Sequence, residues 1–421
     1  MKLQKILHRL QKLHPKEIDL SLDRIKNLCK KLGDPQDKIK SISVVGTNGK
    51  QSTINALFSI LKEANFKCNV YTSPHVQKIN ERFIFANEEL NDDELADLFE
   101  EASKINNNQP ITFFEILTAS YFYKAAQYPE NINLIESGLF HRFDATNILK
   151  NNLASIVTSI GLDHLDWLPK NEQTIEKIVF EKTSNLLSSN IVVAKQSSEK
   201  TLNLIKKNIS NNKSNKIIFN EKYSYSINEN GFIYYEDEYG SLKLPQPNVL
   251  GNFQIENIST AIATIRNLNF KVSEEDIKKG ITKIKCIARF QEIKKGKLKN
   301  LCKNNKIYID GSHNVLGSKV LNEHLETIKC NKHIILGMMA NKDHEEYIGH
   351  FKNISSMTTI DIPGQPNSIK GKDLKKKINK YHKVQFKKSI IDAIKSCKLL
   401  DDDIIIITGS LYLAGEVLKL N

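Results

Sequence analysis

A seven-residue segment near the start of the chain has the residue types that hold a nucleotide phosphate. It reads Gly46-Thr47-Asn48-Gly49-Lys50-Gln51-Ser52, after an apolar run at 42–45 and before apolar residues with helical spacing. Glycines let backbone N–H groups approach an anion, a helix N-terminus adds positive potential, and a lysine adds a mobile charge. Ser52 is a candidate Mg²⁺ ligand. Because the spacing differs from G-x-x-x-x-G-K-[ST], a tight strand-to-helix turn without a nucleotide is the alternative.

Reactive side chains also follow several expected strands. Ser73 follows a strand over 68–72, Glu136 ends the strand over 133–135, and Asp163-His164 follows the strand over 154–160. Open α/β sheets bind ligands at the carboxyl ends of their strands, and Mg²⁺ prefers oxygen ligands. We therefore expect Ser52, Ser73 and Glu136 to supply an Mg²⁺ site and His164 to serve a second, softer cation. An Asp-His pair after a strand is more often a cap or turn, which is the alternative for that pair.

The elements that position these groups alternate between strand and helix. Helices are expected over 112–124, 174–187 and 257–268, a further strand over 191–194, and a second α/β unit from about residue 290. This alternation is typical of a doubly wound, mostly parallel sheet. We expect a P-loop-type domain over residues 1–286, with a β-rich excursion at about 196–245, and a Rossmann-like α/β domain over 287–421.

Composition narrows the class of protein. The chain has 421 residues, a net charge of +13, and only six arginines among 61 basic residues. Such a lysine bias is typical of an AT-rich genome, so most of this charge is expected to be solvated surface. Six scattered cysteines without a C-x-x-C pair indicate reduced thiols. No run approaches the roughly 18 apolar residues of a membrane span, and the N-terminus lacks a secretory pattern. We expect a cytoplasmic protein without membrane or nucleic-acid partners.

The ordered motifs of the chain resemble the folylpolyglutamate synthase/dihydrofolate synthase enzymes of the Mur ligase superfamily. The resemblance runs from His14 to Val417. Its segments are Gly46–Lys50, Thr72-Ser73-Pro74-His75, Asn80-Glu81-Arg82, Phe114-Glu115, Asp144-Ala145-Thr146-Asn147, Ile160-Gly161-Leu162-Asp163-His164, Glu181-Lys182, Arg289-Phe290, Asp310-Gly311-Ser312-His313-Asn314 and Gly409-Ser410-Leu411-Tyr412-Leu413.

What the resemblance implies is an ATP-dependent amide ligase. A carboxylate of dihydropteroate or of a folate would attack the γ-phosphate of ATP, and L-glutamate would attack the resulting acyl phosphate. The implied nucleotide-site residues are Gly46, Thr47, Asn48, Gly49, Lys50, Gln51, Ser52, Asn257, Arg289 and Asp310, with His313 as a further catalytic residue. The implied pterin-site residues are Arg82, Phe114 and Asp144.

The resemblance also implies two Mg²⁺ sites. Ser52, Ser73 and Glu136 would hold one ion, and Glu136, His164 and a carbamylated Lys182 the other, with K⁺ as a further candidate cation. A helix over 174–187 would place Lys182 on its apolar face, where the alternative is a lysine that extends its amine to water. The family also suggests a monomer that acts on small molecules.

Several positions depart from the family pattern. Gln51 stands where the family usually has glycine, and Ile287-Ala288 stands where it has Pro-Gly. Phe140-His141 replaces Gly-Gly, so the shape of the loop near the acceptor is an open question. His344, beside Lys342-Asp343, is expected to be solvated.

Two rival functions remain. A cell-wall amino-acid ligase of the same superfamily usually carries an additional N-terminal substrate domain, for which 45 residues before the glycine loop leave no room. A nucleotide switch that only hydrolyses ATP would not need Arg289 or the Asp310–Asn314 segment. Neither alternative explains the motifs as fully as a folate-directed ligase does.

Overall fold

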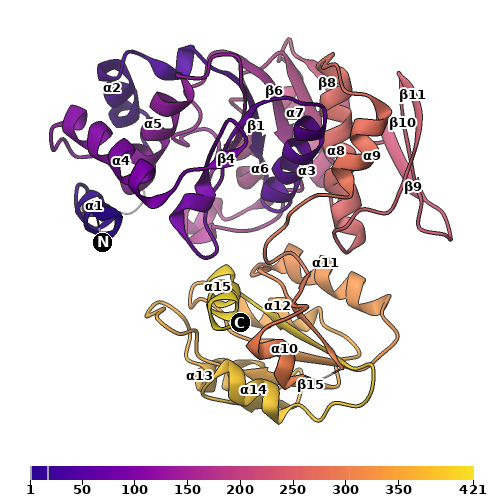
Figure 1. Ribbon diagram of the computed structural model, residues 1–421. Coiled ribbons are helices and arrows are strands. Elements are labelled where there is room, and N and C mark those ends of the chain that lie inside the picture. The colour runs from indigo at the N-terminus through magenta and orange to yellow at the C-terminus, as the bar shows by residue number, and fades with distance from the viewer. Residues whose placement is uncertain (1, 17–18, 303) are drawn as a thin grey trace. The chain divides into compact units, whose positions relative to one another are not determined.

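The protein is described by a computed structural model that covers residues 2–16, 19–302 and 304–421 (Figure 1). The chain forms two compact units. Unit 1 contains Met1–Ile160, Asn171–Asn248 and Gln254–Ile284, and unit 2 contains Gly161–Lys170, Val249–Phe253 and Lys285–Asn421. The sequence placed a boundary after residue 286; the contacts divide the chain after Ile284 and also assign two short earlier segments to unit 2.

Unit 1 is built on an eight-stranded sheet. Its strand order is β4-β3-β2-β5-β1-β6-β7-β8. The strands are β1 (Lys40–Val45), β2 (Cys68–Tyr71), β3 (Phe83–Phe85), β4 (Glu88–Glu89), β5 (Ile132–Glu136), β6 (Asn152–Val157), β7 (Asn190–Val193) and β8 (Asn215–Ile218). Six neighbouring strands pair in parallel, in the order β2-β5-β1-β6-β7-β8. Strands β3 and β4 add an antiparallel edge next to β2. The expected doubly wound α/β architecture is confirmed.

Helices connect these strands. They are α1 (Lys2–Leu10), α2 (Asp23–Lys31), α3 (Lys50–Glu63), α4 (Asp92–Asn106), α5 (Phe113–Ala125), α6 (Ile175–Thr183), α7 (Glu199–Ile209), α8 (Asn252–Asn267) and α9 (Glu274–Ile281), with short 3₁₀ turns at Pro35–Asp37, Ile79–Arg82, Leu165–Trp167 and Lys170–Glu172. Helix α5 begins at a capping box, in which Thr112 accepts from the Glu115 N–H and Glu115 accepts from the Thr112 N–H. It is buried on nearly all sides. Helix α6 ends four residues before the expected end at 187.

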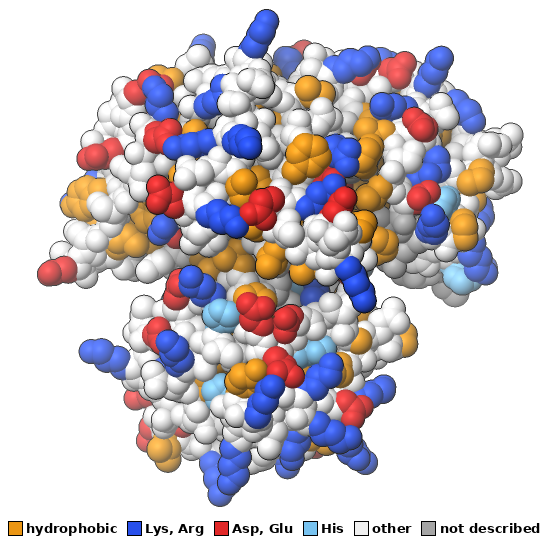
Figure 2. Space-filling model, turned by 180° about the vertical axis from the view of Figure 1, so that it is seen from behind, with side chains coloured by type: hydrophobic (Ala, Val, Ile, Leu, Met, Phe, Trp, Pro, Cys, Tyr) orange, Lys and Arg blue, Asp and Glu red, His pale blue; other side chains and the backbone are white. Residues whose placement is uncertain are grey.

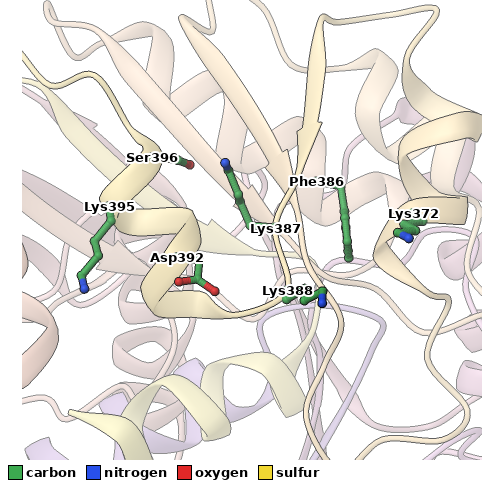
Figure 3. Close-up of a pocket in the computed structure, with 7 residues that line it drawn as sticks. All are labelled: Lys372, Phe386, Lys387, Lys388, Asp392, Lys395 and Ser396. Atoms are coloured by element: carbon green, nitrogen blue, oxygen red, sulfur yellow. The ribbon is translucent and has the colours of Figure 1, made fainter.

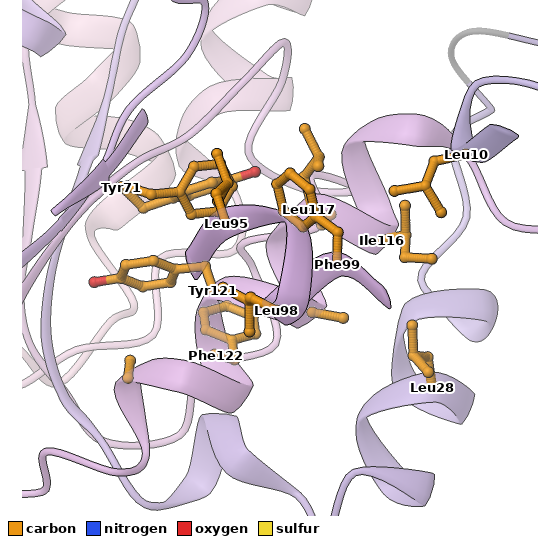
Figure 4. Close-up of a cluster of buried hydrophobic side chains, with 14 of the residues drawn as sticks. Leu10, Leu28, Tyr71, Leu95, Leu98, Phe99, Ile116, Leu117, Tyr121 and Phe122 are labelled. Carbon is orange, nitrogen blue, oxygen red and sulfur yellow. The ribbon is translucent and has the colours of Figure 1, made fainter. Parts of the chain in front are cut away.

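A large apolar cluster holds the N-terminal helices against the sheet. Figure 4 shows Leu10, Leu28, Phe99 and Tyr121 among its members, contributed by α1, α2, α4 and α5. Several of its rings stack, including Tyr71 on Tyr121 with centroids 4.9 Å apart. Burial of large side chains is the main stabilising term in such a layer. The cluster therefore fixes α5, whose first turn carries Phe114.

The β-rich excursion is smaller than expected. Helix α7 leads into strand β8, which is the last strand of the main sheet. Only the strands within residues 223–244 form a separate antiparallel sheet. Its strands are β9 (Tyr223–Ile227), β10 (Ile233–Asp237) and β11 (Gly240–Leu244), drawn as the hairpin-like projection of unit 1 in Figure 1.

Unit 2 contains a six-stranded sheet of order β12-β13-β17-β14-β15-β16. Its elements are β12 (Gln291–Glu292), α10 (Lys297–Leu301), β13 (Lys306–Ile309), α11 (Val315–Glu326), β14 (Lys332–Leu336), α12 (His344–Gly349), β15 (Ser356–Thr359), α13 (Gly371–Ile378), β16 (Val384–Phe386), α14 (Ile390–Ser396), β17 (Ile404–Thr408) and α15 (Leu411–Leu420). All pairs are parallel except β12 with β13. The two edge strands of this sheet, β12 and β16, are only two and three residues long.

Two further features concern the surface and the helices. On the face shown in Figure 2, basic and acidic side chains are interspersed over unit 1, and Lys and Arg predominate along the lower margin of unit 2.

None of the helices in the described part of the chain is long and apolar enough to cross a membrane.

Candidate active site

The glycine segment forms a tight loop between β1 and α3. Gly46 has φ +153° and Gly49 has φ +90°, a backbone region that favours glycine. A Cβ at position 46 would lie 2.0 Å from Thr158 Oγ1, and one at position 49 would lie 2.5 Å from Asn257 Oδ1. The N–H groups of Thr47 and Asn48 both donate to Ser159 O. Glycine is therefore required at both positions by close approach as well as by φ.

Two lysine ammonium groups converge on this loop. Lys50 Nζ donates to the carbonyl oxygens of Gly46 and Thr47, each at 3.1 Å. Lys182 Nζ, which comes from α6, donates to the same Gly46 oxygen at 3.0 Å and to Leu139 O at 2.9 Å. The Lys182 side chain is buried, at 2% exposure, so it does not extend to water. The result is two positive charges beside the N-terminus of α3, where an anion would be stabilised.

Hydroxyl and carboxylate oxygens lie at the neighbouring strand ends. Glu136 ends β5, which pairs with β1 in the register Val44↔Glu136. Its Oε2 accepts from the backbone N–H of Ser73 at 3.0 Å, so Ser73 and Glu136 are brought together. Ser52, on the first turn of α3, is also buried. Among the described residues no group of three or more His, Cys, Asp and Glu has metal-site geometry. A carboxylate with hydroxyl oxygens is nonetheless a donor set that suits Mg²⁺.

The loop over residues 137–147 holds Asp144 close to Phe114 of α5. Asp144 is buried, and its carboxylate accepts from the N–H groups of Gly138 and Thr146 and from the Thr146 hydroxyl. Burial raises the pKa of Asp144, although these hydrogen bonds favour the charged form. A Cβ at Gly138 would lie 2.9 Å from Asp144 Oδ2 and 3.1 Å from the Phe114 ring. The structure therefore places these two predicted pterin-site residues side by side around Gly138.

Phe140 and His141, the departure from the family pattern, are both buried in this loop. The Phe140 ring centroid lies 5.7 Å from Lys182 Nζ, a cation–π distance. His141 Nδ1 lies 3.0 Å from Ser137 Oγ, and the His141 N–H donates to Glu181 O. Burial, and then the charge of Lys182, lower the pKa of His141 to about 4. Phe140 therefore packs beside the Lys182 ammonium group, and His141 lies near enough to feel its charge.

Two other predicted residues of unit 1 have defined partners. Arg82 Nε donates to His75 Nδ1 at 2.9 Å, which fixes the guanidinium over the segment that follows β2. Asn257, on α8, accepts from Thr53 Oγ1 at 3.4 Å. Asn257 therefore lies against the glycine loop, although the two are about two hundred residues apart in sequence.

In unit 2, Arg289 and Asp310 form a second constellation. Asp310 Oδ2 accepts from the Phe290 N–H and its Oδ1 from the Ser312 N–H, both at 2.9 Å. Arg289 Nη1 donates to Ala288 O at 3.2 Å. Ala288 and Phe290, on either side of the arginine, have φ +53° and +49°. Such angles are uncommon for residues with a side chain and often occur at functional positions.

His313 and His164 flank the buried carboxylate of Asp163, also within unit 2. Burial alone would raise the pKa of Asp163, but His164, His313 and Lys342 hold it well below its usual range. Lys342 Nζ donates to Asp163 Oδ1 at 2.7 Å, and Asn314 Nδ2 donates to Oδ2 at 2.8 Å. Burial, and then the charge of Lys342, lower the pKa of His313. His313 Nδ1 lies 2.9 Å from the carbonyl oxygen of Gly311, and His313 Nε2 lies 3.7 Å from Asp163 Oδ2.

The predicted residues thus fall into two sets. Unit 1 holds Gly46, Thr47, Asn48, Gly49, Lys50, Gln51, Ser52, Ser73, Arg82, Phe114, Glu136, Asp144, Lys182 and Asn257; unit 2 holds His164, Arg289, Asp310 and His313. Sequence reasoning missed Lys342, although it follows the end of β14, where ligand groups are expected. The expectation that His344 is solvated is wrong, because its side chain is buried and Nε2 lies 3.0 Å from Met339 O.

Known proteins resemble the chain over nearly its whole length. Residues 288–411 match the family model of the Mur ligase, glutamate ligase domain. The dihydrofolate synthase/folylpolyglutamate synthase of Haemophilus influenzae is 28% identical, covering 97% of this chain and 95% of the relative. The structure of Escherichia coli FolC in complex with DHPP and ADP superposes with a TM-score of 0.86 at 26% identity, covering 99% and 97% of the two chains. A Yersinia pestis bifunctional folylpolyglutamate synthase/dihydrofolate synthase complexed with AMPPNP and Mn ion gives 0.85 at 24%, covering 99% and 97%, a likeness of fold.

The α/β fold, the glycine loop and the C-terminal match together define an ATP-dependent carboxylate–amine ligase of the Mur ligase type. Within that class, the curated relatives that resemble the chain over most of its length include the dihydrofolate synthase/folylpolyglutamate synthases of Haemophilus influenzae and Escherichia coli, at 28% and 29% identity.

Proposed function

We propose that the enzyme uses ATP to attach L-glutamate to dihydropteroate and to the γ-carboxylate of folates, with release of ADP and phosphate. The observation that supports this most strongly is the glycine loop at the N-terminus of α3, where Lys50 Nζ lies 3.1 Å from the Gly46 and Thr47 carbonyl oxygens. The first step would join a carboxylate oxygen of the acceptor to the γ-phosphorus as the bond to ADP breaks. The glutamate amine would then attack the acyl carbon, and phosphate would leave.

Charge neutralisation and positioning supply most of the catalysis in such a reaction. In this proposal Lys50 contacts the β- and γ-phosphates and the backbone of Gly46–Ser52 cradles them. Asn257, which lies against the loop, approaches the nucleotide from α8. Arg289, Asp310 and His313 of unit 2 are proposed to serve the nucleotide and the transferring phosphate.

We propose the acceptor site at the 137–147 loop. Phe114 supplies a ring on which a pterin can stack, and Arg82 supplies a cation for an acceptor carboxylate. The Asp144 carboxylate already accepts three hydrogen bonds from its own loop. Its main contribution is therefore to hold Gly138 against Phe114, with any pterin contact made by a lone pair that remains.

Divalent cations are proposed at two positions. Ser52, Ser73 and Glu136 would hold one Mg²⁺, and Glu136, His164 and a carbamate on Lys182 would hold the second, with K⁺ as a further candidate. A bound Mg²⁺ would neutralise phosphate charge and orient the phosphates.

Carbamylation of Lys182 is the most specific part of this proposal. The neutral amine would attack CO₂ to form an N–C bond and release one proton, which gives an anionic oxygen ligand. Burial at 2% exposure favours the neutral amine, and the carbamate would give up the hydrogen bonds to Gly46 and Leu139. We expect ¹³C NMR in ¹³C-bicarbonate to show a carbamate signal that is lost in Lys182→Ala. Partial rescue of the activity of that variant by millimolar acetate or formate is also expected. A wild-type enzyme that is active but shows no ¹³C carbamate signal would contradict the carbamate.

The function itself is tested by ATP turnover with labelled glutamate. Dihydropteroate, tetrahydrofolate and a nucleotide-linked muropeptide are offered separately, and a control omits every acceptor. We expect acceptor-dependent ADP release matched by glutamate incorporation. ATP hydrolysis that ignores every acceptor would favour a nucleotide switch, and incorporation only with a nucleotide-linked muropeptide would favour a cell-wall ligase.

A further inference from the structure

Unit 2 carries a basic hollow that the proposed reaction does not use. It has a volume of about 650 Å³ and lies beside β16, the edge strand of the six-stranded sheet. Four lysines line it: Lys372 from α13, Lys387 and Lys388 from the turn after β16, and Lys395 from α14. Figure 3 shows the Lys372, Lys387 and Lys388 side chains distributed around the ring of Phe386. Three separate elements therefore bring positive charge to one concave surface.

These lysines are not neutralised by neighbouring carboxylates. Within the described part of the chain, none of the four makes an ion pair, whereas Lys376 on the next turn of α13 lies 3.1 Å from Asp373. The one acidic residue of the hollow, Asp392, accepts from Ser389 Oγ at 2.8 Å as part of the cap of α14. The hollow thus has a net positive charge that an anionic ligand can neutralise.

The hollow also has a fixed apolar wall. Phe386 is half-buried, and its ring packs so closely on α13 that a Cβ at Gly371 would lie 2.8 Å from the ring. Lys372 Nζ lies 5.8 Å from the centre of the same ring. An occupant must therefore combine negative charges with aliphatic or flat apolar surface.

All four basic side chains of the hollow are lysines, as are most basic residues of this chain. Flexible lysines act as independent point charges, without the planar, bidentate fork of arginine. Independent charges suit single carboxylates carried at intervals along a flexible chain. A γ-linked oligoglutamate has this chemistry, since each residue carries one α-carboxylate and two methylene groups that can cover Phe386.

We propose that this hollow binds the oligo-γ-glutamyl tail of a folate, outside the site that performs the chemistry. The inference rests on the proposed function, which makes that tail. Such binding would favour acceptors that already carry several glutamates, and salt would weaken it because exposed ion pairs are screened.

The test compares acceptors that differ only in tail length. Lys387→Gln with Lys388→Gln removes two charges, and Lys372→Gln removes one from a different element. The matched control is Lys278→Gln with Lys419→Gln, which removes two lysines that each lie 2.7 Å from an acidic partner. An exposed ion pair changes affinity about threefold, so the double variant is expected to raise KM for a pentaglutamyl tetrahydrofolate about tenfold. The monoglutamyl acceptor and the control variant should stay within about twofold.

Binding is measured separately with penta-γ-glutamate that carries no pterin. Isothermal titration at low and at physiological salt should show weaker binding to the Lys387/Lys388 variant than to the control. Hydrogen exchange over residues 384–396 should slow in the wild type on adding this probe. Equal affinity of variant and control overturns the proposal, as does tighter binding of tripolyphosphate or of a short RNA that the same substitutions abolish. Failure of the proposed function is distinguishable, because then no acceptor of any tail length takes up glutamate.

Discussion

Two loops of this enzyme achieve unusual backbone angles by different means. The glycine loop of unit 1 uses Gly46 and Gly49, where a Cβ would overlap Thr158 and Asn257. The arginine turn of unit 2, Ala288–Phe290, places residues with side chains at φ +53° and +49° around Arg289. In the first loop the lack of a side chain makes room for close contacts. In the second, the surroundings impose the angles on residues that do not favour them.

The contacts of the arginine turn explain how it is held. Phe290 is buried and stacks on Tyr308 with centroids 4.4 Å apart, and its N–H donates to Asp310. Ala288 is fully buried, its N–H donates to Gln291 Oε1, and its carbonyl accepts from Gly311. A left-handed angle costs about 1–2 kcal/mol for a non-glycine residue. The turn on either side of Arg289 therefore stores strain, whereas the glycine loop has glycine at both of its positive-φ positions and avoids this cost.

The largest expected effect removes the charge of the glycine loop. Lys50→Ala should lower kcat by about 10² to 10³, because one preorganised contact to developing charge is lost. The unfolding midpoint should change little, since Lys50 Nζ bonds only to loop carbonyls. The control is Lys62→Ala, which removes one positive charge from an exposed lysine at the other end of α3. Turnover of the Lys50 variant near that of the control would exclude a phosphate-binding role.

The second prediction concerns acid sensitivity beside the glycine loop. His141 has its pKa lowered from 6.5 to about 4 by burial and by Lys182. A depressed histidine pKa contributes stability that is present above pH 6.5 and lost as pH falls through about 4. Over that window the wild type should lose up to about 3 kcal/mol more than His141→Gln, which keeps a hydrogen-bonding side chain near Ser137 but does not titrate. Parallel denaturant curves of the two proteins at every pH would contradict this.

The sequence was most informative where function depends on local spacing. The glycine loop, the strand-end residues Ser73 and Glu136, and the α/β alternation are patterns within a few residues of each other, and they could be predicted. Family resemblance placed Asp144 and Phe114 in one pocket, and the structure puts them together around Gly138.

What the sequence could not predict depends on contacts between distant positions. Lys342 pairs with Asp163, 179 residues away, and no local pattern marks that pair. Likewise, Phe140 and His141 were recognised as departures, but their packing around Lys182 depends on where α6 lies. The left-handed angle of Phe290 was also hidden, because phenylalanine ordinarily avoids it, whereas the family's glycine at position 288 was a signal for the angle of Ala288.

The third prediction separates the two reasons for glycine in the loop. Gly49→Ala should cost about 1–3 kcal/mol, from its φ of +90° and from overlap with Asn257. Gly240→Ala is the matched control, because Gly240 has φ +107° but no atom within 4 Å of an added Cβ. Denaturant unfolding should show a larger loss for position 49, and KM for ATP should rise only there. Equal losses at both positions would mean that φ alone requires glycine.

The smallest expected effect lies in the arginine turn. Ala288→Gly relieves a left-handed alanine, which favours folding by about 1–2 kcal/mol, but it adds freedom to the unfolded chain, which opposes folding by about 0.4–1 kcal/mol. Loss of the fully buried Ala288 methyl group opposes folding by about a further 0.8 kcal/mol, so the expected net change in unfolding free energy lies within about 1 kcal/mol of zero. Ala414→Gly, at a buried helical position in α15, should instead lose about 1 kcal/mol or more. If the strain of the turn serves to aim Arg289, the Ala288 variant should combine this small change in stability with a kcat reduced a few-fold. A loss of stability like that of Ala414→Gly would show that the turn is unstrained at Ala288, and the contrast with the glycine loop would then rest on Phe290 alone.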